Sequence, residues 1–223
     1  MPPETAAEAP VPPDAGSGHE RAGHVRDTIT IAVLSITALL TAWCGFESSK
    51  WGGEMSISFS QASSTRIEAA RQQGIANNAR QIDLSVWSLY VEATAEDNTE
   101  LRTYVQQRFS DEFAVAFDAW VEAGRPNSGS VQGPFAMPEY VPPGTQESAA
   151  ADQRAEQLFA QGLTDNRRGD NYTILTVLAA LVLFFAALSG RLPSPRAQWM
   201  MLGFAMVLLV TASIIAATFP VIV

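Results

Sequence analysis

The sequence predicts an all-α membrane protein with three transmembrane helices and an extracytoplasmic helical-bundle or coiled-coil-like domain between the first and second. Three uncharged stretches carry this prediction, at residues 28–46, 172–190 and 197–223. At about 1.5 Å per residue, a helix of about 19 residues reaches roughly 28 Å, close to the thickness of a bilayer's hydrocarbon core. Only 17% of the 223 residues are charged, against about 25% in an average soluble domain.

The placement of arginines predicts the orientation of these spans. Arg21 and Arg26 precede the first span, 26–46, and Arg191 and Arg196 lie in the short link 191–196 between the spans 172–190 and 197–223. Because basic residues next to spans collect on the cytoplasmic side, we expect the N-terminus inside and the C-terminus outside. Localisation in a bacterial inner membrane is the corresponding expectation. Residues 1–25 are rich in Pro, Ala, Gly and Glu, which predicts a disordered cytoplasmic tail.

The predicted outer domain, residues 47–171, contains a long helix over 55–95. Its apolar residues recur with alternating spacings of four and three, which is the pattern of a helix packed in a coiled-coil-like seam. The seam comprises Ile75, Ala79, Ile82, Val86, Leu89 and Ala93. Two shorter helices cannot cover so long a helix, so we expect a homo-oligomer, with Ile75, Ile82, Val86 and Leu89 at its interface.

Capping patterns predict the rest of the outer domain. Asp97 with Glu100 resembles a capping box, Ser110 is a typical N-cap, and Gly124 before Arg125-Pro126 ends a helix. The Pro- and Gly-rich loop 125–145 either drapes over a core or binds a partner. A helix resumes near residue 146, where an apolar stripe recurs at spacings of four, three and four through Ala151, Ala155, Leu158 and Gly162. Like the first long helix, it continues into its membrane span or breaks at the interface, and Gly52-Gly53 is a candidate kink.

Composition excludes several classes of chemistry. The outer domain contains no histidine or cysteine, which excludes Ser-His-Asp and Cys-His catalysis there and a Glu-x-x-His di-iron bundle. The net charge of −9 argues against nucleic acid as a partner. We therefore predict no enzymatic activity, no cofactor and no metal site, and interpret the outer carboxylates as a solvated surface.

Polar residues at the first span leave alternatives open. Thr30, Thr37 and Thr41 fall at roughly helical spacing and either line a pore or mediate helix packing, which Ser and Thr permit inside membranes. Lys50 lies between Glu47 and Glu54 and either forms a local ion-pair ladder with them or contacts an anionic lipid headgroup.

Five short patterns resemble a family of uncharacterised bacterial inner-membrane proteins: Trp43-Cys44-Gly45-Phe46, Lys50-Trp51-x-Gly53, Arg66-x-Glu68-Ala69, Arg108-Phe109-x-x-Glu112-Phe113 through Phe117-x-Ala119-Trp120, and Pro134 to Tyr140. The resemblance implies a bacterial origin and the same topology, and no activity or ligand. We expect a non-enzymatic, self-associating scaffold or accessory subunit of the envelope, with the bilayer, further copies and another membrane protein as candidate partners. An oligomeric channel lined by the first span and an extracytoplasmic sensor subunit are the alternatives.

Overall fold

A computed structural model describes residues 17–124 and 133–222, and every regular element in these ranges is helical. The elements are α1 (Ser17–Ala95), α2 (Thr99–Gln106), α3 (Asp111–Glu122), the 3₁₀ turn η1 (Pro134–Ala136), α4 (Thr145–Ser189) and α5 (Pro195–Thr218). The all-α prediction is confirmed for the described residues. Three of the helices, α1, α4 and α5, are long and apolar enough to cross a membrane.

The chain divides into two compact units, each of which contains part of α1 and part of α4. The membrane unit comprises residues 1–54 and 164–223, and the distal unit comprises residues 55–163. The boundaries of these units, at 54/55 and 163/164, differ from those of the predicted outer domain 47–171, whose position outside the membrane stays a prediction.

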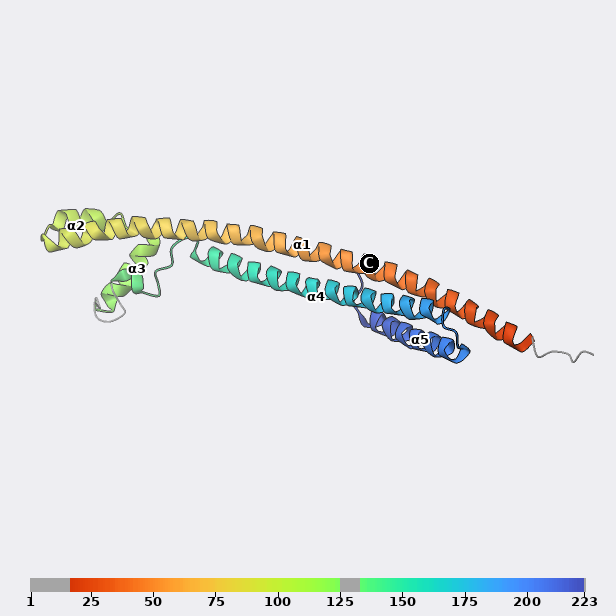
Figure 1. The fold of residues 1–223 in the computed structure, drawn as a ribbon. Coiled ribbons are helices and arrows are strands. Elements are labelled where there is room, and N and C mark those ends of the chain that lie inside the picture. The colour runs from red at the N-terminus through yellow and green to blue at the C-terminus, as the bar shows by residue number, and fades with distance from the viewer. Residues whose placement is uncertain (1–16, 125–132, 223) are drawn as a thin grey trace, which may run out of the picture. The chain divides into compact units, whose positions relative to one another are not determined.

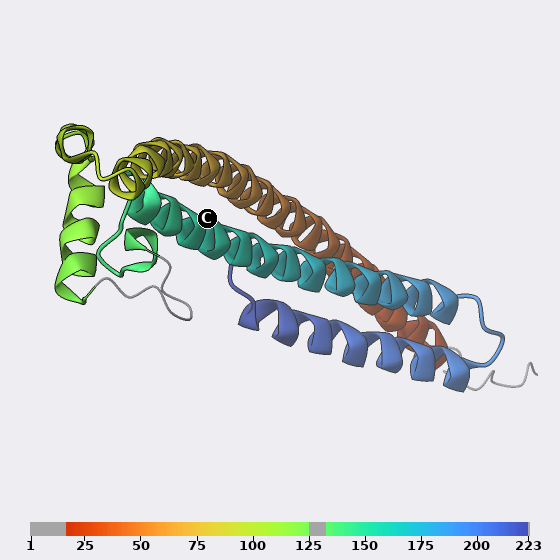
Figure 2. The same ribbon diagram turned by 90° about the vertical axis from the view of Figure 1, so that its left-hand side faces the viewer.

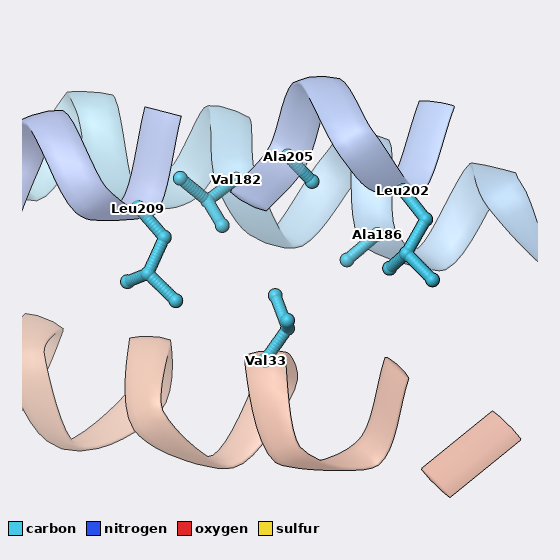
Figure 3. Close-up of a cluster of buried hydrophobic side chains, with 6 residues drawn as sticks. All are labelled: Val33, Val182, Ala186, Leu202, Ala205 and Leu209. Atoms are coloured by element: carbon cyan, nitrogen blue, oxygen red, sulfur yellow. The ribbon is translucent and has the colours of Figure 1, made fainter. Parts of the chain in front are cut away.

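In the membrane unit, α1, the second half of α4 and α5 lie side by side (Figures 1 and 2). Figure 3 shows Val33 of α1 directed toward side chains of the other two helices, which are Val182, Ala186, Leu202, Ala205 and Leu209. Small residues such as Ala186 and Ala205 are fully buried in this cluster, so the helix backbones approach closely. A second cluster around Cys44, Trp51 and Tyr172 fills the other end of the unit.

Several predicted boundaries are wrong, for local reasons. Residues 17–25 are helical and belong to α1, so the predicted disordered tail 1–25 is too long; residues 1–16 lie outside the described residues. The helix α5 ends at Thr218, short of the predicted 223, because Pro220 disfavours a helical conformation in the residue before it. Gly52-Gly53 causes no break, and α1 continues through it.

In the distal unit, α1 packs against the first part of α4 through small residues. Ala62, Ala69 and Ala76 of α1 and Ala155 of α4 are all buried. The predicted α4 stripe, Ala151, Ala155, Leu158 and Gly162, coincides with the buried face. Gly162 lies so close to α1 that an added Cβ would be 2.6 Å from a ring atom of Phe59, which is why this position requires glycine.

The rest of the distal unit is an aromatic core at the end of α1. Ser110 accepts a hydrogen bond from the Phe113 amide and caps α3, as predicted. The N-cap of α2 is Asn98 rather than Asp97, because Asp97 adopts a left-handed conformation with φ of 55° and the Asn98 side chain accepts from the Leu101 amide at 3.0 Å. In the described part of the loop 125–145, Phe135 and Tyr140 pack on Phe113, which agrees with draping.

Candidate functional site

The most unusual chemical feature of the membrane unit is a buried acid, Glu47. Its side chain is 0% exposed, one residue past the first uncharged stretch. Oε2 accepts a hydrogen bond of 3.1 Å from the backbone amide of Ile222. Oε1 is also buried and has no hydrogen-bond partner among the described residues.

The neighbours of Glu47 complete a polar cluster inside an apolar unit. Trp51, one turn further along α1, is buried, and its indole Nε1 has no acceptor among the described residues. Tyr172 of α4 is buried beside them, and its hydroxyl donates to the carbonyl oxygen of Pro220 at 3.1 Å. Glu47 and Tyr172 thus both bind the segment that follows α5, one through an N–H and one through a C=O.

A second set of contacts joins α1 to α4 next to this cluster. The Arg168 guanidinium lies 4.5 Å from the centre of the Trp51 ring and pairs with the nearly buried Asp165 at 3.2 Å. Ser48 donates a hydrogen bond to the Gly169 carbonyl oxygen at 3.1 Å. These polar bonds fix the register of the two helices, which apolar packing alone specifies weakly.

The structure contradicts the predicted ion-pair ladder around Lys50. Glu47 points into the membrane unit, and within the described residues no ion pair joins Lys50 to Glu47 or Glu54. Lys50 itself is exposed. The ladder failed because residues 44, 47 and 51 lie on the face of α1 that packs against α4 and α5, so Glu47 faces the interior. The alternative, contact with a lipid headgroup, stays a prediction.

The three threonines of the first span bond to their own helix. The hydroxyls of Thr30, Thr37 and Thr41 donate to the carbonyl oxygens four residues earlier, at 3.0, 2.6 and 2.8 Å. Thr37 is 0% exposed and lies among the three helices, and the other two are partly buried. Burial of Thr37 is compatible with the packing alternative, and the choice between packing and a pore stays a prediction.

The predicted oligomer seam lies beside the intramolecular face of α1. The residues that face α4 and the aromatic core are Ala76, Asp83 and Tyr90, each one position after a predicted seam residue. Ile75, Ile82 and Leu89 are 44, 57 and 49% exposed, and Val86 packs partly against the aromatic core. The heptad period was correct, and Ala79, Val86 and Ala93 of the predicted seam are buried or half-buried. The other buried row, residues 76, 83 and 90, is rotated by one residue from the predicted 75, 82 and 89, about 100° around the helix.

Buried Asp83 has a specific partner in the distal unit. It accepts a hydrogen bond of 2.9 Å from the Tyr140 hydroxyl, and both side chains are buried. Burial and the bond to the Asp83 carboxylate raise the pKa of Tyr140 well above its ordinary value. Tyr140 therefore stays protonated and fastens the loop 133–144 to α1.

The described residues contain no group of three or more His, Cys, Asp or Glu side chains that could hold a metal ion. Glu47 and Asp83 were not recognised as important from the sequence. Asp83 lies outside the predicted four-and-three repeat, and Glu47 lies before the helix to which that repeat was assigned, so no local sequence pattern marked either residue as buried.

No protein-family model matches the chain, and no curated protein or solved structure is significantly similar to it. The resemblance to a bacterial inner-membrane family therefore stays a prediction.

Proposed function

We propose that the chain is a non-enzymatic integral membrane protein of the bacterial envelope that self-associates through α1 and serves as a scaffold or accessory subunit. The observation that carries this proposal is the aliphatic strip, which we define as Ile75, Ile82 and Leu89 with Val86 beside them. Its three outer members are about half exposed and recur every seven residues. They belong to the distal unit, whereas the uncharged stretches belong to the membrane unit.

The surroundings of the strip suit contact with an identical chain. Between Arg71 and Glu92 the only charged residues are Arg80 and Asp83. Asp83 is buried, and Arg80 lies about 160° around the helix from Ile82. The residues flanking the strip are Gly74, Asn78, Gln81, Ser85 and Ser88.

Depletion of charge is characteristic of interface cores. It matters here because the predicted outer region 47–171 carries 18 acidic and 10 basic residues. Two copies would repel each other across most of that surface, but the uncharged strip adds no electrostatic repulsion where they meet.

The membrane supplies a second constraint on such an assembly. Copies inserted in one orientation are related by a rotation axis along the membrane normal, so equivalent helices run parallel. In a parallel coiled coil, equivalent residues of a heptad meet in the same layer. Ile82 of one copy would then face Ile82 of the next. With Arg26, Arg191 and Arg196 at the cytoplasmic edge, the strip is extracytoplasmic.

Charge insertion tests this proposal. In Ile82→Glu, each copy of a dimer loses at least about 1.4 kcal/mol of apolar burial, and the two new charges repel, so we expect dissociation to increase about 100-fold or more. The measurement is the oligomeric mass of the full-length protein in detergent over a concentration series. Leu84→Glu is the matched control, because Leu84 is 43% exposed on the opposite side of α1. A wild-type protein that stays monomeric at the highest concentration, or equal effects of the two variants, would contradict the proposal.

A further inference from the structure

A groove on the membrane unit lies between α1 and α5. It has a volume of about 390 Å³. Ile29 lines it from α1, and Trp199, Gly203, Met206, Val207 and Val210 line it from α5. All of these residues belong to helices long and apolar enough to span a membrane, so the groove opens toward hydrocarbon rather than water.

The lining of the groove presents almost no polar group. Thr211 is its hydroxyl-bearing member, and that hydroxyl donates to the Val207 carbonyl oxygen at 2.9 Å. At Gly203 an added Cβ would meet no atom within 4 Å. Because Gly203 has no side chain, a hollow runs along α5 at this position. The shape and the apolar lining of the groove suit an acyl chain.

Positive charge lies at one end of this groove. Arg196 is seven residues before Gly203, about 20° from it around α5, and is exposed, as is Arg191 in the preceding link. Within the described residues, neither arginine forms an ion pair. Arg26 of α1 is already occupied, because it pairs with Asp27 at 2.7 Å and donates to Gln198.

The same end carries the first backbone amides of α5, which begin at Arg196 because Pro195 has no N–H. The helix α5 begins at Pro195 after Ser194, whose side chain makes no capping hydrogen bond. The first amides of a helix, together with its dipole, attract phosphate groups. Arg196, the helix start and the apolar groove therefore follow one another along a single face of α5, and Arg191 lies in the link that precedes this helix.

We propose that this face binds one phospholipid with an anionic headgroup, with its phosphate at Arg191, Arg196 and the start of α5 and one acyl chain in the groove past Gly203. Charge complementarity favours a lipid over a transmembrane helix of a partner protein. A lipid carries its phosphate next to the acyl chains, whereas a helix would need an acidic residue to face the two arginines. Trp199 lies between Arg196 and Gly203 in the sequence of α5, at the level expected for the membrane–water interface, where tryptophan is enriched.

The test measures lipid retention by the full-length protein. Purified protein in detergent is titrated with phosphatidylglycerol or phosphatidylcholine, and native mass spectrometry counts the lipids retained per chain. We expect one retained phosphatidylglycerol, in preference to phosphatidylcholine. Arg191→Gln with Arg196→Gln should weaken phosphatidylglycerol binding about 25-fold, since each basic residue near a membrane surface contributes about fivefold, and should leave phosphatidylcholine binding unchanged.

Filling the groove tests the acyl-chain part separately. Gly203→Leu places a side chain in open space and should abolish retention of both lipids. Gly45→Leu is the matched control, because Gly45 is another exposed glycine of the membrane unit with no atom within 4 Å of an added Cβ. Arg154→Gln controls for removing a positive charge elsewhere, because Arg154 is exposed in the distal unit.

Three results would overturn the proposal. The first is unchanged phosphatidylglycerol retention in the double arginine variant, whose substitutions lie at exposed positions and keep the fold. The second is equal loss in Arg154→Gln, which would show that the loss follows from overall charge and not from a site at α5. The third is a Gly203→Leu protein that changes oligomeric mass but not lipid retention, which would assign the groove to a second copy. None of these results bears on the aliphatic strip, which Ile82→Glu tests independently.

Discussion

Removing the Tyr140 hydroxyl should lower the free energy of unfolding of the distal unit, by an amount that depends on pH. In Tyr140→Phe the ring contacts with Phe113 and Phe135 remain, but buried Asp83 loses its 2.9 Å hydrogen bond. Hydrogen bonds to charged groups contribute about 1.5–3 kcal/mol. With a urea dependence of about 1.5 kcal/mol per molar, the unfolding midpoint of the distal unit should fall by about 1–2 M at neutral pH.

The sign of the pH dependence follows from the direction of the pKa shift. The folded state raises the pKa of Tyr140 above its ordinary value of 10.0, so its stabilisation is complete below pH 10 and decreases as pH rises past 10. Above that pH the unfolded wild-type chain loses the Tyr140 proton while the folded chain keeps it. The difference in unfolding free energy between wild type and Tyr140→Phe should then narrow by about 1.4 kcal/mol per pH unit.

Urea unfolding of the full chain in a mild detergent, followed by tryptophan fluorescence at pH 7 and at pH 10–11, measures both effects. Tyr104→Phe is the control, because the Tyr104 ring is 53% exposed and stacks on Arg108 at 3.5 Å. It should change stability by less than about 0.5 kcal/mol. A Tyr140→Phe protein as stable as wild type, or a difference that widens above pH 10, would refute the reasoning.

Three further predictions concern other contacts. Gly162→Ala should destabilise the distal unit by about 1–3 kcal/mol in the same urea assay, because its Cβ overlaps the Phe59 ring; unchanged stability would mean that the ring shifts freely. Glu47→Ala should increase hydrogen exchange at the Ile222 amide roughly 5- to 150-fold through loss of a buried acceptor, whereas Glu47→Gln keeps an acceptor and most of the protection; equal exchange in both variants would rule this out. Thr37→Val should leave the ion permeability of protein-containing liposomes at its wild-type value, since the hydroxyl is buried and bonded to its own helix, and a changed conductance would support the channel alternative.

The sequence was sufficient for features that depend on local patterns. Uncharged stretches predicted the three membrane helices, Ser110 was identified as a cap, and the spacing of Ala155 and Gly162 predicted the buried face of α4. Each of these depends on residues a few positions apart, whose relation is fixed by helix geometry.

The predictions that were wrong concern contacts between residues that are distant in the sequence. The apolar residues Ile75, Ile82 and Leu89 fit a heptad better than Ala76, Asp83 and Tyr90 do, yet the second row is buried. The reason is that Tyr90 packs in the aromatic core and that Asp83 is compensated by Tyr140, which lies 57 residues away. Glu47 looked like a surface charge for the same reason, since its partner Ile222 lies 175 residues away. No local pattern reports such pairs.

Cysteine cross-linking in native membranes tests self-association through the aliphatic strip most directly. Cys44 is the only cysteine of the chain and is buried, so a Cys44→Ala background carries a single added thiol at either of two positions on α1. We predict that Ile82→Cys forms a disulfide-linked dimer under mild oxidation and that Leu84→Cys, on the opposite side of the helix, does not. Equal cross-linking at both positions, or efficient cross-linking only at Leu84, would contradict the account.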